Sequence, residues 1–292
     1  VILWKVSHWR PTWNYDIALA KDMITFSKWV LASALLSWFF IWGDLFVLGY
    51  FFSPHEMGLY RTGNYFVGAI LGLVTAPIAP VMYSYFSKIQ HDKETIKKAL
   101  LFSSKVISFF VLPIGLGIYL VQTPLADSIF GSKWEGIAPV IGYLAIMHSV
   151  SWIIGLNNNA YKALGRPDLE AKILIFSLFS YFVIYMITAQ ISFEIFLIAR
   201  MLLAVASIFV HIYASKKLLG VGYSDTIKNI YVILLSLLSI YALDKIFFGN
   251  VNTLSSLFLV LILGVAIYII SIKLLDGQFL AKIMSILKNR KV

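Results

Sequence analysis

The chain has 292 residues, of which 60% are hydrophobic and 13% are charged, with a formal net charge of +10 and no cysteine. A soluble globular domain carries roughly 25% charged residues, so this chain has too few polar side chains to cover a water-facing surface. The lack of cysteine excludes disulfides, thiolate metal sites and a cysteine nucleophile. The basic residues lie in short connections between apolar runs, which indicates membrane orientation and argues against nucleic-acid binding.

Eight apolar segments have about the length that crosses a ~30 Å hydrocarbon core as a helix. They cover residues 27–51, 63–86, 103–122, 137–156, 171–189, 193–214, 227–247 and 254–274. None shows the alternation of a barrel strand. The sequence therefore predicts an all-α, polytopic transmembrane helical bundle of about eight spans.

The distribution of Lys and Arg gives this bundle a direction. Twenty of the 24 basic residues fall in the N-terminal lead-in, in the C-terminal tail or around every second connection between spans. The other side has only Arg61, Lys133 and Lys245. Because cytoplasmic loops are enriched in Lys and Arg, we expect both termini of this chain in the cytoplasm and an even number of spans.

Two charged residues lie deep inside predicted spans, well away from the span ends. Asp44 is in the first span and Arg200 in the sixth, and at 1.5 Å per residue both are expected at similar depth in the outer half of the bilayer. A charge there costs at least about 2.5–3.5 kcal/mol unless it faces protein, water or a partner. Ser37 and Ser33 share the helix face of Asp44. We expect these four residues to line an aqueous cavity that meets a polar solute or a coupling ion. The alternative is a structural ion pair, or a small-residue helix contact with a stray charge.

The second span carries residues that favour cavity lining, close packing and bending. In chain order these are Asn64, Gly68, Gly72, Pro77 and Pro80. Gly68 and Gly72 form a small-residue pair that allows close helix approach, and each proline removes a backbone donor and kinks a helix. Broken helices near the midplane are typical of transporters. We expect a hinge here and at Pro113 in the third span, with a static packing kink as the alternative.

Residues for catalysis are scarce. The five histidines are scattered over different segments, and the sequence contains no metalloprotease, nucleophile-elbow or phosphate-loop motif. We therefore expect no catalytic residue, no bound metal and no cofactor.

The C-terminal tail, residues 276–292, has apolar residues at helical spacing with lysines between them. This pattern favours a short basic amphipathic helix on the inner membrane surface; a frayed basic tail is the alternative.

Five short stretches occur in an order and spacing that resemble a known family. They are Gly43–Gly49 with Met57–Tyr60, Ala76–Pro80 with Tyr83-Ser84, Pro113–Leu116, Ile129–Trp134 and Lys162–Arg166. In this register they resemble the second half of bacterial polysaccharide-biosynthesis flippases. These are lipid-linked oligosaccharide transporters of the multidrug/oligosaccharidyl-lipid/polysaccharide exporter superfamily.

The resemblance implies a fold of two six-helix lobes, often followed by two further helices. Residues 27–214 would form the second, six-helix lobe, and residues 215–275 the two additional transmembrane helices. Residues 1–26 would be the cytoplasmic linker between lobes. The first lobe would then be missing, and a chain that starts at Val1 rather than Met would be a fragment.

The resemblance also implies a function. An undecaprenyl-diphosphate-linked oligosaccharide would move across the bacterial cytoplasmic membrane by alternating access, for surface polysaccharide synthesis, with Arg200 as a contact for an acidic sugar or diphosphate. The expected partners are this substrate, membrane lipids and polysaccharide polymerase or assembly proteins, without nucleic acid. The alternatives are a cation-coupled multidrug exporter, a peptidoglycan-precursor flippase of the same superfamily, and a polytopic polysaccharide polymerase or ligase.

Overall fold

The computed structural model describes residues 7, 16–245 and 254–288. These residues form the following helices: α2 (Ile17–Phe51), α3 (Pro54–Thr75), α4 (Ile78–Lys88), α5 (Lys93–Leu120), α6 (Gln122–Ile129), the short 3-10 helix η1 (Ser132–Trp134), α7 (Ile137–Ser151), α8 (Asn157–Ala163), α9 (Pro167–Ala189), α10 (Phe193–Leu219), α11 (Tyr223–Leu243), α12 (Leu254–Leu275) and α13 (Gly277–Lys288). No strand occurs among the described residues. The predicted all-α class is confirmed.

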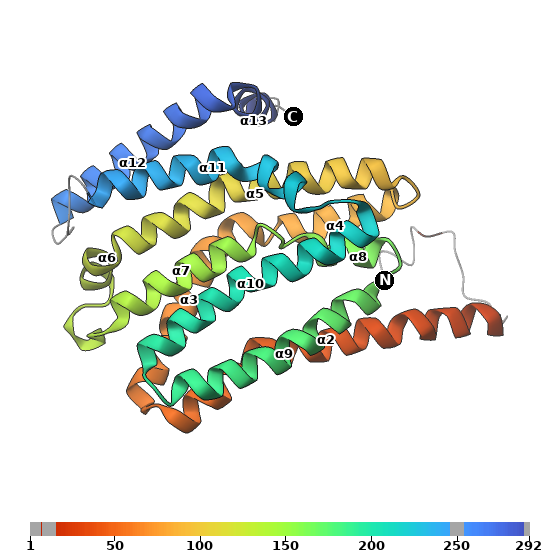
Figure 1. Cartoon of the computed structure of the whole chain (residues 1–292), viewed down its shortest axis with the longest axis horizontal. Coiled ribbons are helices and arrows are strands. Elements are labelled where there is room, and N and C mark those ends of the chain that lie inside the picture. Colours follow the sequence, from red (N-terminus) through yellow and green to blue (C-terminus); the bar gives the residue numbers. More distant parts are fainter. Residues whose placement is uncertain (1–6, 8–15, 246–253, 289–292) are drawn as a thin grey trace.

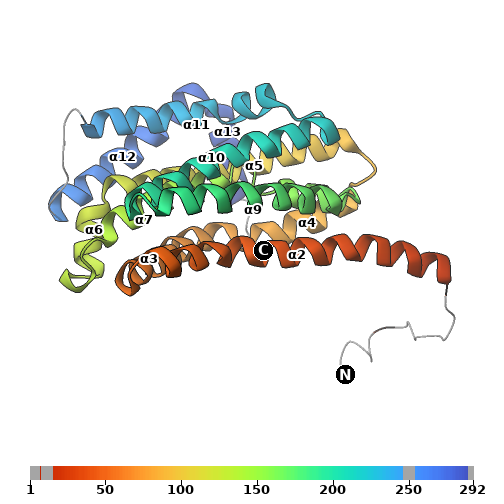
Figure 2. The same cartoon turned by 60° about the horizontal axis from the view of Figure 1, so that its bottom comes forward.

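The long helices lie side by side along the length of the molecule (Figures 1 and 2). The α4–α5, α8–α9 and α10–α11 connections lie at the same end of the bundle as the start of α2 (Figure 1). Basic residues at or beside these connections include Lys88, Lys93, Lys162, Lys172, Lys216 and Lys217. We call this the lysine-rich end.

Polar side chains mark where helices begin. Asp16 accepts a hydrogen bond from the Leu19 amide at 3.0 Å, so α2 starts ten residues before the predicted span. Asp92 caps α5 through the Thr95 amide at 3.0 Å. The Thr95 hydroxyl and amide together hold the pKa of the Asp92 carboxyl below its usual range. The rest of the predicted lead-in, residues 1–6 and 8–15, lies outside the described residues.

Each of the eight predicted segments coincides with a helix or a broken pair of helices. Within the described part of the chain, five helices are long and apolar enough to cross a membrane: α2, α5, α9, α10 and α11. Two bent pairs, α3 with α4 and α12 with α13, raise this number to as many as seven. The remaining segment is α7, an apolar helix of only 15 residues. The chain is thus a multi-pass membrane protein, and the eighth crossing depends on α7.

The outer surface is rich in apolar side chains. Leu73, Phe179 and Leu274 have exposed fractions of 82%, 74% and 79%, which suits contact with lipid rather than water. The buried apolar residues form two clusters. We call the one built mainly on α2–α10 the main cluster. The one that joins α5 to α11, α12 and α13 we call the second cluster.

The second predicted span is broken between α3 and α4, whose axes differ by 42°. Pro77 lies at the break, and Pro80 lies in the first turn of α4. Pro113, in contrast, lies inside α5 without ending it. Proline therefore coincides with a helix break in the second predicted span, but not in the third.

The expected close packing at Gly68 and Gly72 is not found among the described residues. A methyl group added at either glycine would meet no atom within 4 Å. The buried face of α3 carries Val67 and Leu71, one residue earlier and so about 100° away around the helix. On that face Gly63 makes the close contact, because an added Cβ would lie 2.9 Å from Val140.

The tail is helical as far as Lys288, and α13 turns by 109° from α12. Phe279 and Ile283, on its apolar face, are buried in the second cluster. Much of this face therefore packs on protein. Its placement on a membrane surface stays a prediction, and residues 289–292 lie outside the described part of the chain.

Candidate functional site

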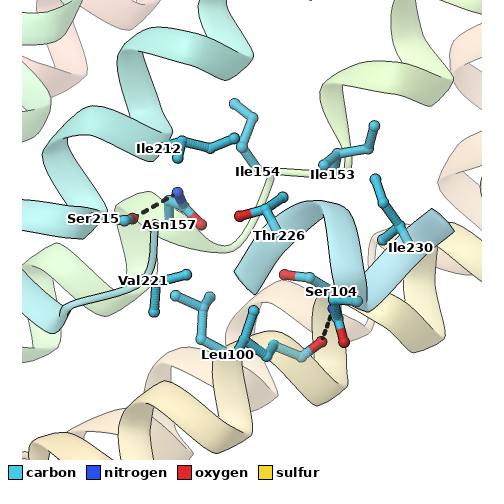
Figure 3. A pocket seen from close by; sticks show the side chains of 12 residues that line it. Leu100, Ser104, Ile153, Ile154, Asn157, Ile212, Ser215, Val221, Thr226 and Ile230 are labelled. Carbon is cyan, nitrogen blue, oxygen red and sulfur yellow. Dashed lines mark hydrogen bonds between the residues drawn. The ribbon is translucent and has the colours of Figure 1, made fainter. Parts of the chain in front are cut away.

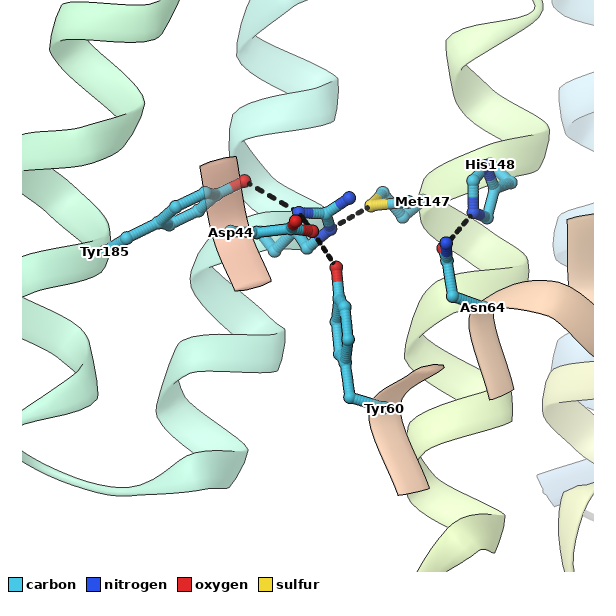
Figure 4. A network of polar contacts seen from close by, with 7 residues as sticks. Asp44, Tyr60, Asn64, Met147, His148 and Tyr185 are labelled. Carbon is cyan, nitrogen blue, oxygen red and sulfur yellow. Dashed lines mark hydrogen bonds and ion pairs between the residues drawn. The ribbon is translucent and has the colours of Figure 1, made fainter. Parts of the chain in front are cut away.

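Asp44 of α2 and Arg200 of α10 meet in the interior of the bundle, although 156 positions separate them in the chain (Figure 4). The Arg200 guanidinium donates through Nη1 to Asp44 Oδ2. The side chains of Asp44 and Arg200 are only 2% and 11% exposed. The ion pair that the sequence left open as an alternative is present, and we call it, with its neighbours below, the charged centre.

Two tyrosines complete the charged centre. The Tyr60 hydroxyl of α3 donates to Asp44 Oδ2, the same oxygen that accepts from Arg200. The Tyr185 hydroxyl of α9 accepts from Arg200 Nη1 at 3.4 Å. The guanidinium carbon also lies 5.3 Å and 5.9 Å from the ring centroids of Tyr60 and Tyr185, within the range of cation–π attraction.

Helix α7 closes the other side of the guanidinium. Arg200 Nε donates to the Met147 sulfur at 3.2 Å. The next residue, His148, shares a hydrogen bond of 2.8 Å between its Nε2 and Asn64 Oδ1 of α3. Side chains from α2, α3, α7, α9 and α10 therefore converge in one layer of the bundle (Figure 4). Such a layer fixes the rotation and depth of five helices relative to one another.

The charged centre is not fully satisfied. Asp44 Oδ2 accepts two hydrogen bonds, whereas Asp44 Oδ1 is buried and has no partner among the described residues. Asp44, Tyr60 and Asn64 also line a hollow of about 80 Å³ between α2 and α3, together with Trp42 and Arg61. Carboxylate, amide, guanidinium and indole groups surround this hollow, whose present volume admits a few water molecules or one polar group of a larger solute.

The two serines of the predicted cavity have a different role from Asp44. Ser33 is 1% exposed, and its hydroxyl donates to the Trp29 carbonyl of its own helix at 2.8 Å. Ser37 is half-buried. The face that carries them is turned into the protein, but neither serine lines the hollow next to Asp44. Of the predicted cavity residues, Asp44, Arg200 and Asn64 come together.

Sequence reasoning missed Tyr60, Tyr185 and Met147. Tyr60 lies four residues before Asn64, one helical turn away, and that spacing places both side chains on one face of α3. This spacing was the signal that could have revealed Tyr60. Tyr185 and Met147 carry no such signal, because an aromatic or sulfur-containing residue in an apolar span reads as ordinary packing.

A second polar cluster lies where α8 meets the last turns of α10, and Figure 3 shows its Asn157–Ser215 contact. Asn157 Nδ2 donates to Ser215 Oγ at 2.9 Å, and the Tyr161 hydroxyl donates to the His211 carbonyl at 3.0 Å. The hollow beside them, which Ser104 and other residues line, measures about 20 Å³. That volume admits about one water molecule, so this cluster joins α8 to α10 and has no room for a sugar.

Comparison with known proteins finds similar sequences among proteins of polysaccharide biosynthesis. Residues 1–139 match the family model described as polysaccharide biosynthesis protein. The teichuronic acid biosynthesis protein TuaB of Bacillus subtilis is 25% identical over 58% of this chain and 35% of its own length. The lipopolysaccharide biosynthesis protein WzxC of Escherichia coli is 24% identical over 83% of this chain and 50% of its own.

A third relative is archaeal. The protein named probable low-salt glycan biosynthesis flippase Agl15, from Haloferax volcanii, is 26% identical over 54% of this chain and 34% of its own length. The chain thus spans about a third to a half of the length of these curated relatives. No solved structure matches it. The resemblance seen in the sequence motifs is confirmed: this multi-pass membrane chain is similar to polysaccharide biosynthesis proteins, one of which is named as a probable flippase.

Proposed function

We propose that the protein is a flippase that moves a lipid-linked oligosaccharide, carried on undecaprenyl diphosphate, across the bacterial cytoplasmic membrane. The observation that carries this proposal is the similarity to polysaccharide biosynthesis proteins, one of which is named as a flippase. The protein then acts as a transporter and not as an enzyme. Both termini of this chain lie in the cytoplasm, as the concentration of lysines at one end of the bundle supports.

The charged centre is the part of this chain that we assign to the sugar. Its ion pair lies in the interior of an apolar bundle, beside a hollow lined by Asp44, Asn64 and Trp42. Intramembrane ionisable groups usually serve a solute or ion path. In alternating access, the hollow opens to one side of the membrane at a time. The break between α3 and α4, 42° in angle, offers a place for that movement.

The test is made in cells that lack the gene. Lipid-linked repeat units should accumulate on the cytoplasmic face, and surface polysaccharide should fall; the intact gene should restore both. A complementing gene with Arg200→Ala should restore membrane insertion but not export. Unchanged surface polysaccharide in the deletion strain would reject the flippase. Normal export by the Arg200→Ala variant would remove the charged centre from the sugar path.

A further inference from the structure

A groove separate from the charged centre opens between α2, α4 and α8. Its volume is about 400 Å³, within the usual size range of small-molecule sites. The residues that line it are Phe26, Val30, Ala79, Pro80, Tyr83, Asn159 and Lys162. All three helices reach it near the lysine-rich end, so the groove lies at the predicted cytoplasmic side.

The groove has an apolar wall and a polar rim. Phe26, Val30 and Pro80 offer only carbon to an occupant, and Phe26 remains 38% exposed. The rim consists of the Tyr83 hydroxyl, the Asn159 amide and the Lys162 ammonium. An apolar wall beside a cation matches an amphiphile that carries an anionic group.

The polar rim is held in place by contacts behind it. Lys162 Nζ lies 2.9 Å from Glu170 Oε2, and the Glu170 side chain is only 7% exposed. An ammonium group has three donors, so this contact leaves donors for an occupant. Asn159 Nδ2 donates to the Ala79 carbonyl at 3.1 Å, which ties α8 to the first turn of α4. The rim is therefore organised before any ligand arrives.

The surroundings of the groove carry an excess of positive charge. Lys28 and Lys172 lie 6.0 Å and 5.9 Å from the Trp29 ring, one residue before Val30. Arg166 and Lys172 share Asp168 at 2.8 Å and 2.9 Å. With Lys162, four basic residues stand against two acidic ones, Asp168 and Glu170. The field at the mouth favours a dianionic group over a neutral one.

We infer that this groove holds the prenyl-diphosphate portion of the lipid-linked substrate on the cytoplasmic side. The first isoprene units lie on the wall formed by Phe26, Val30 and Pro80, and the diphosphate accepts hydrogen bonds from Lys162 and Asn159. This inference rests on the proposed function and adds a loading site to it. The groove borders the α3–α4 break, because Ala79 and Pro80 belong to the first turn of α4. Occupancy therefore contacts the helix that has to move.

The experiment measures equilibrium binding of radiolabelled farnesyl diphosphate to the purified full-length protein in detergent. Ala79→Phe fills the groove without a change in charge, and Lys162→Gln removes the rim cation. Both should weaken binding at least tenfold. Lys162→Arg, which keeps the contact with Glu170, should bind within threefold of the wild type. Ala266→Phe on the exposed face of α12 and Lys217→Gln on α10 are matched controls, expected to bind as the wild type does.

Three competitors identify the ligand chemistry. Farnesol lacks the phosphates, pyrophosphate lacks the chain, and phosphatidylglycerol is a bulk anionic lipid; each should compete at least tenfold more weakly than unlabelled farnesyl diphosphate. Equal competition by phosphatidylglycerol would make the groove a general lipid site and overturn the inference. If both groove variants bind farnesyl diphosphate as tightly as the wild type, the groove is not the binding site and the inference is overturned. The proposed flippase function would be unaffected by that result. No binding to the wild type would count against the prenyl-diphosphate substrate itself.

Discussion

The main cluster and the second cluster are held together in different ways. In the main cluster, five helices meet at the charged centre through side-chain hydrogen bonds and an ion pair. In the second cluster, aromatic rings pack among aliphatic side chains: the ring centroid of Phe109 lies 5.4 Å from that of Tyr268 and 5.6 Å from that of Phe279. Polar contacts are directional and fix one arrangement, whereas apolar contacts tolerate sliding. We therefore expect the helices of the main cluster to keep one fixed register, and the helices of the second cluster to pack in a more adaptable way.

Helix α5 belongs to both regions and shows the contrast within one turn. At Gly115, which faces α7, an added Cβ would lie 2.2 Å from Ser149 Oγ and 2.8 Å from the Ala145 carbonyl. At Gly117, the nearest atom to an added Cβ is Leu261 of α12 at 3.9 Å, an ordinary contact. The α5–α7 contact thus leaves no room for a methyl group, and the α5–α12 contact does.

The largest effect is expected when one of the two charges of the Asp44–Arg200 ion pair is removed. Asp44→Asn or Arg200→Met leaves the other charge buried without its partner, and removal of one partner from a buried pair costs about 3–5 kcal/mol. Each single variant should show a marked loss of thermal stability in detergent. The double variant Asp44→Leu with Arg200→Met should recover most of that loss, because two apolar residues leave no unpaired charge.

Export by the double variant separates stability from transport. If the charged centre contacts sugar, the double variant should be folded and inserted but inactive. A stable double variant with normal export would show that the pair serves only to position helices. Additive losses in the double variant would contradict the coupling between Asp44 and Arg200.

The next largest effect is expected from alanine substitutions of the two glycines of α5. Gly115→Ala should destabilise the protein by about 1–3 kcal/mol, because the methyl group must displace the Ala145 backbone or Ser149. Gly117→Ala should be neutral or stabilising by up to about 1 kcal/mol, since alanine is the better helix former. Denaturation in one detergent, with both variants side by side, tests this. Equal losses in the two variants would remove the distinction between the faces of α5.

Most of the helical frame could be predicted from composition and apolar length. Every predicted apolar segment corresponds to helix over most of its described length, since ~20 apolar residues in lipid must satisfy their own backbone groups. The start of α2 could not be placed, because residues 17–26 are too polar to read as a span although Asp16 caps them as helix. The early end of α7 was also not predicted. Its helix stops at Ser151, and the chain turns irregularly before Asn157, although the apolar segment continues.

The charged centre was predictable only in part. An intramembrane charge is rare enough to single out Asp44 and Arg200, and their similar depths suggested a meeting. The contact itself required knowledge of how α2 and α10 pack around α9, which no local pattern in the sequence contains. At Gly68 and Gly72, in contrast, a local pattern predicted a contact that the structure does not have. Their spacing suits close packing, but Val67 and Leu71 lie on the buried face of α3 instead.

A smaller effect is expected in the second cluster. The Tyr268 hydroxyl donates to the Phe109 carbonyl at 2.9 Å inside the apolar interface between α12 and α5. Tyr268→Phe should cost about 0.5–1.5 kcal/mol, the usual value for one hydrogen bond. Hydrogen exchange of α12 should rise while that of α9 and α10 stays constant. Faster exchange in both clusters would contradict their separate stabilisation.

The smallest effect, that of Asp276→Asn, tests what holds α13 against α5. Asp276 pairs with Lys105 of α5, with side chains 17% and 22% exposed for Lys105 and Asp276, and it also caps α13 through the Phe279 amide at 3.3 Å. Asp276→Asn keeps a capping oxygen and loses the charge, so it should cost only about 0.2–1 kcal/mol. Asp276→Ala loses the cap as well and should cost about 1 kcal/mol more. Proteolysis of α13 measures both losses. Because the apolar face of Phe279 and Ile283 remains buried in either variant, α13 should stay attached; its release by Asp276→Asn alone would mean that a charge, and not apolar packing, holds the second cluster in place.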